Sequence, residues 1–111
     1  MSTQPVPLTD ANFETEALQA SQPVLVDFYA DWCGPCQALT PVLAELASDF
    51  EGRAVIGKVD VDAAPALASR YGVRSIPTLV ILQNGEEVDR IVGLTTKRAL
   101  AEKLDSLPVS R

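Results

Sequence analysis

Two cysteines separated by two residues are the side chains of this 111-residue chain best suited to chemistry. They lie in the segment Trp32-Cys33-Gly34-Pro35-Cys36. Residues three apart on a helix have Cβ atoms about 5–6 Å apart, so a disulfide can form there with little movement of the backbone. Such a short loop stabilises a fold by only about 2 kcal/mol, which is little for a structural brace. The pair is better explained as a bond that is repeatedly formed and reduced.

The two thiols are predicted to differ because of their places relative to a helix. Cys33 falls at the expected N-terminus, where free N–H groups and the positive end of the helix dipole favour a thiolate. Cys36 lies one turn further along and is expected to be shielded, whereas Cys33 is expected to be exposed. We therefore predict that Cys33 attacks a substrate disulfide and that Cys36 resolves the mixed disulfide.

The lack of histidine narrows the alternatives for these cysteines. With two cysteines and no histidine, one chain cannot supply a four-ligand zinc site of cysteine and histidine, and only a cluster shared between two chains is left open. Catalytic pairs of serine or cysteine with histidine are excluded as well. We expect no metal and no cofactor other than the redox-active disulfide.

The charge and the hydropathy of the chain exclude further classes of partner. The net charge is −6 and the nine basic residues form no cluster, so neither nucleic acid nor a membrane surface is an expected partner. No apolar run approaches the roughly 18 residues of a membrane span. The first residues lack the features of a signal peptide. We expect a cytoplasmic protein, and thiols in that compartment are kept reduced.

The hydrophobic pattern predicts one α/β domain over residues 1–111, with residues 1–7 loose. Strands are expected over residues 24–30, 54–61, 77–82 and 87–92, and helices over 9–18, 35–50, 65–71 and from Thr95 or Thr96 onward. Pro41 should kink the second helix. The alternation predicts parallel strands, and Asn84-Gly85 predicts an antiparallel hairpin. The result is a central mixed β-sheet of four to five strands flanked by about four helices.

Asp27 is the one charged residue of the first predicted strand. Leu25 and Tyr29 share its face of that strand, and Val26 and Phe28 lie on the other. An apolar pattern on both faces is typical of a central strand that is covered on both sides. We therefore expect the Asp27 carboxyl to be buried, and burial raises the pKa of a carboxyl group.

Several segments, in this order, resemble the thioredoxin family and together span nearly the whole chain. They are Asp27, Phe28-Tyr29-Ala30-Asp31-Trp32-Cys33-Gly34-Pro35-Cys36 with Pro41 after it, Lys58-Val59-Asp60, Tyr71-Gly72-Val73-Arg74-Ser75-Ile76-Pro77-Thr78, Asn84-Gly85 and Val92-Gly93. The resemblance implies the thioredoxin fold.

The resemblance also implies roles for residues around the cysteines. Asp27 is expected to lie behind Cys36 and to act as its general base through water. Lys58 is expected to approach Asp27 and to tune its charge. The remaining residues implied to set the geometry and the reduction potential are Gly34, Pro35 and Pro41.

A substrate-binding surface is expected beside the disulfide. Trp32 precedes the nucleophile and is predicted to form contact surface. The resemblance implies that the Ile76-Pro77 bond is cis, faces the disulfide, and lets the Ile76 backbone pair with a substrate chain. Gly93 is expected to leave room for that chain. Two residues depart from many relatives: Gln37 replaces a basic residue, and Tyr29 replaces a tryptophan, which leaves Trp32 as the single tryptophan.

The function implied by the resemblance is the reduction of protein disulfides. The expected partners are an NADPH-dependent flavoprotein (FAD) thioredoxin reductase and clients such as ribonucleotide reductase, peroxiredoxin and methionine sulfoxide reductase. The chain is expected to be a monomer. One alternative is a disulfide-forming oxidant of the same fold, although such enzymes often carry histidine where Gly34-Pro35 stands. The other is a redox-independent binding module that docks partners around Trp32, Ile76, Pro77 and Gly93.

Overall fold

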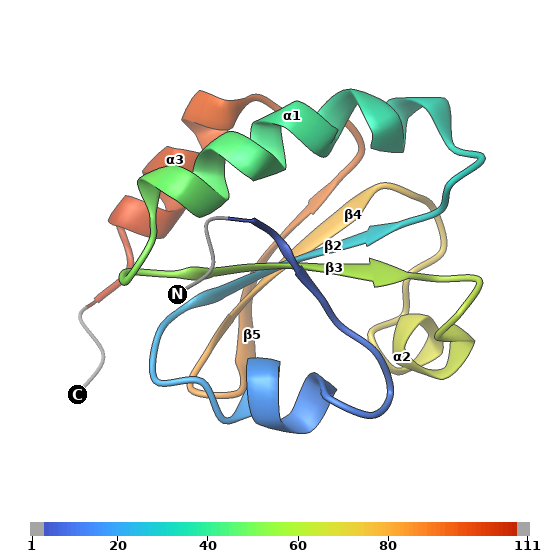
Figure 1. The fold of residues 1–111 in the computed structure, drawn as a ribbon, viewed down its shortest axis with the longest axis horizontal. Helices are drawn as coiled ribbons and strands as arrows, with labels where there is room; N and C mark the ends of the chain where they lie inside the picture. Colours follow the sequence, from blue (N-terminus) through green and yellow to red (C-terminus); the bar gives the residue numbers. More distant parts are fainter. Residues whose placement is uncertain (1–3, 109–111) are drawn as a thin grey trace.

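The computed structural model describes residues 4–108, which form a five-stranded mixed sheet between two layers of helices (Figure 1). The strand order is β1-β3-β2-β4-β5, in which β1, β3 and β2 are parallel and β4 and β5 are antiparallel to their neighbours. In chain order the elements are β1 Val6–Pro7, η1 Glu14–Leu18 (a single π-helical segment), β2 Val24–Tyr29, α1 Gly34–Asp49, β3 Val55–Asp60, α2 Pro65–Arg70, β4 Thr78–Gln83, β5 Glu86–Val92 and α3 Lys97–Asp105.

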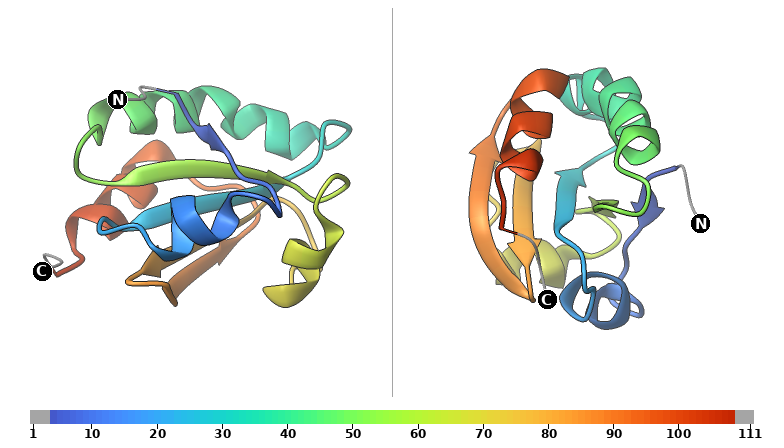
Figure 2. Two further views of the ribbon diagram at one scale, coloured as in Figure 1. Left: turned by 60° about the horizontal axis from the view of Figure 1, so that its bottom comes forward. Right: turned by 90° about the vertical axis from the view of Figure 1, so that its left-hand side faces the viewer.

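The sheet has a separate apolar core on each of its faces. Helices α1 and α3 cover one face, and η1 and α2 lie on the other (Figures 1 and 2). Leu25 of β2 packs in the core under α1 and α3, while Val26 and Phe28 pack in the core of the opposite face. Because β2 is buried on both sides, it is apolar on both faces, as the sequence predicts. The predicted α/β architecture with a central mixed sheet is confirmed.

The prediction of a loose segment over residues 1–7 is wrong for Val6 and Pro7. These residues form β1 and pair in parallel register with Gly57 and Lys58 of β3. The backbone N–H of Leu8 then donates to the Lys58 carbonyl oxygen at 2.8 Å. Two residues are too few to show a periodicity, and proline is tolerated because β1 is an edge strand. Residues 1–3 of the predicted loose segment lie outside the described residues.

The other predicted elements differ from the structure mainly at their ends. The helix expected over residues 9–18 is reduced to a turn followed by η1, and Phe13 and Ala17 are buried there. Asn84 (φ 54°) and Gly85 (φ 81°) form the predicted hairpin turn between β4 and β5. Pro41 lies inside α1. Within residues 4–108 no helix is both long and apolar enough to cross a membrane.

The junction of β1 and β3 yields a first prediction. A Cβ atom on Gly57 would overlap the side chain of Leu8, which is 2% exposed and has little room to move. We expect Gly57→Ala to lower the free energy of unfolding by about 1–3 kcal/mol, as overpacked cores do. The measurement is urea unfolding of the reduced protein. Gly34→Ala is the matched control because, apart from its chain neighbours and its own helix backbone, no atom of residues 4–108 lies within 4 Å of the added Cβ. Equal stability of the two variants would contradict the prediction.

Candidate active site

The two cysteines lie where β2 gives way to α1. Cys33 is the N-cap residue of α1, and its Sγ accepts a hydrogen bond from the backbone N–H of Cys36 at 3.3 Å. The first N–H groups of a helix have no partner inside it, so an acceptor at the N-cap satisfies one of them. A negatively charged sulfur is a stronger acceptor than a thiol. The predicted place of Cys33 at the helix N-terminus is confirmed.

Burial distinguishes the two thiols less than the sequence predicts. Both side chains are reduced and buried, with Cys33 5% and Cys36 3% exposed. The expectation that Cys33 is exposed is therefore wrong: Tyr29, Val61 and Ile76 pack around the pair. The spacing of residues along one helix predicts that Cys33 lies at the helix N-terminus. It does not indicate which distant segments of the chain cover Cys33.

The pKa of the Cys36 thiol distinguishes this residue more clearly than its exposed fraction does. Burial, and after it the hydrogen bond with Cys33, raises the pKa of the Cys36 thiol to about 12. The charges of Cys33 and of Asp27 act in the same direction, while a backbone hydrogen bond with Ala30 opposes them. Cys36 therefore keeps its proton at neutral pH unless its surroundings change.

Asp27 is buried beneath α1, as the sequence predicts. Its side chain is 1% exposed, and within residues 4–108 neither carboxylate oxygen has a hydrogen-bond partner. Desolvation raises the pKa of Asp27 from 3.8 to about 7, and the positive charge of Lys58 partly opposes this rise. Lys58 is the register partner of Asp27 across β2 and β3. The structure thus brings Asp27, Lys58 and Cys36 into one electrostatic neighbourhood.

The loop before β4 lies against the first cysteine. The Ile76-Pro77 peptide bond is cis, as the resemblance implies. The Cys33 thiol donates to the Ile76 carbonyl oxygen at a distance of 3.9 Å between Sγ and oxygen. The Gly93 N–H donates to the Pro77 carbonyl at 2.8 Å, and Gly93 has a φ of +95°. Apart from its chain neighbours, no atom of the described residues lies within 4 Å of a Cβ added to Gly93. Residues far apart in the sequence therefore meet beside Cys33, with open space at Gly93.

Trp32 borders the same site and is held by a residue that sequence reasoning missed. Its side chain is 71% exposed, and its Nε1–H donates to Asp62 Oδ2 at 2.8 Å. Asp62 in turn is placed by its own N–H, which donates to Asp60 Oδ1 at 2.9 Å. A shallow hollow beside Trp32 is lined by Val61, Ala68, Val73, Arg74, Ser75 and Ile76. No motif joins residues 32 and 62, so only the fold reveals this contact.

A model of the thioredoxin family matches residues 4–106 of the chain. The chain belongs to the thioredoxin family. It is 52% identical over 97 residues to a thioredoxin of Chlorobaculum thiosulfatiphilum, covering 87% of this chain and 90% of that one. It is 51% identical over 100 residues to a thioredoxin of Staphylococcus aureus, covering 90% and 94%. The solved structure of a mutant thioredoxin from Halobacterium salinarum superposes with a TM-score of 0.83 at 42% identity, covering 98% and 93%.

Membership of the thioredoxin family confirms the predicted fold and the predicted class of function. The chain is a thiol–disulfide oxidoreductase with a redox-active pair of cysteines. The family implies, in general terms, a reductase that renews the dithiol and clients that carry disulfides. Within residues 4–108 no group of three or more histidine, cysteine or acidic side chains is placed to hold a metal ion.

Gln37, the residue directly after Cys36, contacts the loop that precedes α1. The Nε2 of Gln37 donates to the Asp31 carbonyl at 2.6 Å. An uncharged side chain is thereby held against the loop that carries Trp32.

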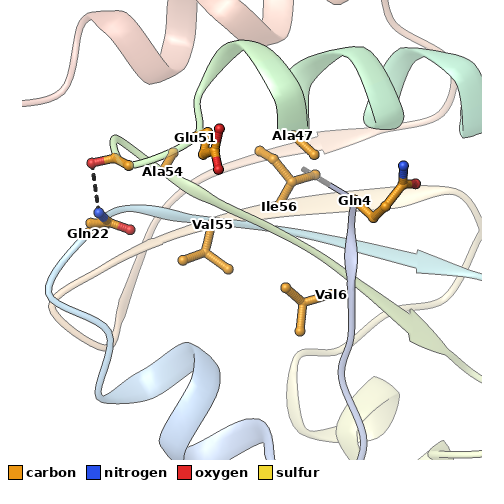
Figure 3. Close-up of a pocket in the computed structure, with 9 residues that line it drawn as sticks. Gln4, Val6, Gln22, Ala47, Glu51, Ala54, Val55 and Ile56 are labelled. Atoms are coloured by element: carbon orange, nitrogen blue, oxygen red, sulfur yellow. Dashed lines mark hydrogen bonds between the residues drawn. The ribbon is translucent and has the colours of Figure 1, made fainter. Parts of the chain in front are cut away.

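A second hollow lies near the start of β3, at the end of the sheet opposite to the cysteines (Figure 3). Gln22 donates to the Gly52 carbonyl there at 2.7 Å, but no residue of the cysteine site lines it.

The buried carboxyl of Asp27 leads to a second prediction. The folded protein holds this proton more tightly than the unfolded chain, because its pKa is about 7 instead of 3.8. Below pH 3.8 the carboxyl is protonated in both states and does not lower the free energy of unfolding. As the pH rises from 3.8 through about 7, the free energy of unfolding falls. At 1.36 kcal/mol per unit, the loss amounts to about 4 kcal/mol.

Asp27→Asn removes this ionisation with almost no change of shape. We expect the variant to exceed the wild type in free energy of unfolding by a margin that grows from pH 4 to pH 8. Denaturant unfolding of the reduced protein at several pH values measures the margin. Asp10→Asn, at an exposed position, is the matched control, and a margin for Asp27→Asn that is constant with pH would refute the prediction.

Proposed function

We propose that the reduced protein passes two electrons to disulfides of other proteins, with Cys33 as the attacking nucleophile. The observation that carries this proposal is the Cys36 N–H donating to Cys33 Sγ at the N-cap of α1. A thiolate is the form that this hydrogen bond and the helix N-terminus stabilise. The Cys33 thiolate attacks one sulfur of the client disulfide. A mixed disulfide forms, and the other client sulfur leaves as a thiolate that takes up a proton.

The second step releases the reduced client and requires Cys36 to lose its proton. The charge of Cys33 and its hydrogen bond, which both raise the Cys36 pKa, disappear once Cys33 is part of the mixed disulfide. The Cys36 proton then passes to Asp27, whose pKa of about 7 suits a base at neutral pH. The Cys36 thiolate attacks Cys33 Sγ, so that the Cys33–Cys36 disulfide forms and the client thiolate departs.

The surface beside Cys33 is proposed to bind the client segment. The residues proposed to bind it are Ile76, whose carbonyl accepts from the Cys33 thiol, and the buried Pro77 that follows it at the cis bond. Gly93, whose N–H donates to the Pro77 carbonyl, and the exposed Trp32 are proposed to complete this surface. An extended client segment can lie along this loop as an added strand, with main-chain hydrogen bonds to Ile76. The residues proposed to tune the geometry and potential of the pair are Gly34, Pro35 and Pro41, and Lys58 is proposed to tune Asp27.

The proposed setting of this reaction is the cytoplasm. An NADPH-dependent flavoprotein thioredoxin reductase would renew the dithiol, and the protein would act as a monomer with one domain over residues 1–111. Ribonucleotide reductase, peroxiredoxin and methionine sulfoxide reductase are the proposed clients. The chain itself would need neither a metal nor a bound cofactor, and neither nucleic acid nor a membrane is proposed as a partner. No observation favours the disulfide-forming oxidant or the redox-independent binding module.

Insulin reduction coupled to NADPH and a thioredoxin reductase tests the proposal. We expect turnover by the wild type, none by Cys33→Ser, and accumulation of a mixed disulfide with Cys36→Ser that non-reducing electrophoresis detects. Full turnover by Cys33→Ser would overturn the assignment of the nucleophile. A reduction potential well above that of the cytosolic glutathione pool would favour the oxidant instead. A double Cys33→Ser, Cys36→Ser variant that retains all client proteins would favour the binding module.

The role of Asp27 gives a separate kinetic prediction. Asp27→Asn should slow the resolution of the mixed disulfide roughly 10²-fold, the lower end of what a general base contributes. The rate of the first attack by Cys33 should change much less. Single-turnover quenching with a disulfide substrate separates the two steps, and the single tryptophan, Trp32, reports the oxidation state by its fluorescence. Equal rates of resolution in the variant and the wild type would exclude Asp27 as the base.

A further inference from the structure

A contact between Lys58 and Tyr29 lies next to the buried carboxyl. The Lys58 Nζ sits over the Tyr29 ring at 4.3 Å from its centroid. This distance is well inside the range of cation–π attraction, in which the negative face of an aromatic ring attracts an ammonium group. Both residues are half-buried, so water screens this attraction less than on an open surface. The contact therefore fixes the position of a charge near the active site.

The sheet places Asp27 at the side of this contact. Tyr29 follows Asp27 by two residues in β2, so both side chains lie on the face that Leu25 presents to α1 and α3. Lys58 is the register partner of Asp27 on the neighbouring parallel strand β3. The ammonium group reaches the ring of Tyr29 by leaning along the strand from that register position. Ring, ammonium and carboxyl thus occupy adjacent positions on one face of two strands.

Other charges compete for the Lys58 ammonium. Burial raises the pKa of the Tyr29 phenol, and the negative charges of Asp60, Asp31 and Asp27 raise it further, so three carboxylates act on this side chain. Within residues 4–108 Lys58 forms no ion pair with any of them, because none of their oxygens lies within the 4 Å of such a pair. The ring is the contact that holds the ammonium among these competitors.

The other groups packed near Asp27 do not offer a second anchor for Lys58. On the opposite side of β2, the register partner of Asp27 is Leu79 of β4, which is fully buried and apolar. From α1, the titratable group that interacts with Asp27 is the Cys36 thiol, which holds its proton at neutral pH. Within the described part of the chain, Lys58 is consequently the one positive charge that opposes the desolvation of Asp27.

We propose that Tyr29 is a positioning residue, whose ring holds the Lys58 ammonium beside Asp27 and keeps it from pairing with Asp60 or Asp31. The aromatic face does this work, and the phenol hydroxyl is not required. The inference rests on the proposed role of Asp27 as the base for Cys36. If Lys58 were released, less positive charge would act on Asp27. Its carboxyl would then be protonated in a larger fraction of molecules at pH 7, and fewer of them could accept the Cys36 proton.

Carboxyl-carbon NMR of the reduced protein, labelled at aspartate, measures the titration of Asp27 directly. Tyr29→Leu should shift the Asp27 titration upward by on the order of 0.5 unit, in the direction that Lys58→Met also shifts it. Tyr29→Phe should titrate like the wild type because it keeps the ring. In the double variant Tyr29→Leu, Lys58→Met, the shift should be no larger than in Lys58→Met alone. Additive shifts, or an unchanged titration in Tyr29→Leu, would overturn the proposal.

A second series keeps the shape of the ring and so remains informative if Tyr29→Leu disturbs folding. In the Tyr29→Phe variant, the new phenylalanine is replaced by 3,4,5-trifluorophenylalanine. The fluorine atoms weaken the negative charge on the face of the ring. The Asp27 titration should then move upward from that of Tyr29→Phe, and identical titrations would contradict the proposal. Because NMR follows the carboxyl without turnover, this result is independent of the kinetic test. Slow resolution in Asp27→Asn is what decides whether Asp27 is the base.

Discussion

The site of this protein depends on one constraint. The carboxyl group of Asp27 is buried, and among residues 4–108 it has no hydrogen-bond partner. Asp27 lies in β2, a strand covered on both faces, under the helix at whose N-terminus the two cysteines lie. A buried and unpaired charge is expensive for a fold, and its pKa shifts toward the neutral form as a result. The same shift makes Asp27 a usable proton acceptor near neutral pH in the proposed reaction. Stability and function therefore oppose each other at this residue.

The two thiols are distinguished by a helix terminus and by this carboxyl. The N-cap of α1 offers Cys33 a hydrogen bond from the Cys36 N–H, while burial and neighbouring negative charge hold the proton on Cys36. The chain contains no histidine, so in the proposed mechanism the backbone and a carboxyl supply what an imidazole supplies in other cysteine sites. In the proposed mechanism the order of the two steps follows from this asymmetry. Lys58 and the Tyr29 ring would then adjust the pKa of the Asp27 carboxyl.

Much of the fold could be predicted because its signals are local. Both faces of β2 are apolar, the Asn84-Gly85 turn has the positive φ values that an antiparallel hairpin requires, and Asp27 is buried as its neighbours indicate. The short strand β1 could not be predicted, since two residues on an edge strand leave no periodic pattern. The burial of Cys33 was also missed, because Ile76 and Val61, which pack around it, come from distant parts of the chain.

The sequence by itself determined the pair of cysteines, their order on a helix, the lack of histidine and the isolated charge in a central strand. These are properties of residue type and of spacing within one element, and the chemistry of disulfide exchange follows from them. Only the tertiary structure decided that Asp62 holds Trp32, that the Ile76 carbonyl meets Cys33, and that the Lys58 ammonium lies over the Tyr29 ring. Each of these contacts joins side chains or backbone from different elements. Their geometry depends on strand register and loop path, which no local pattern contains.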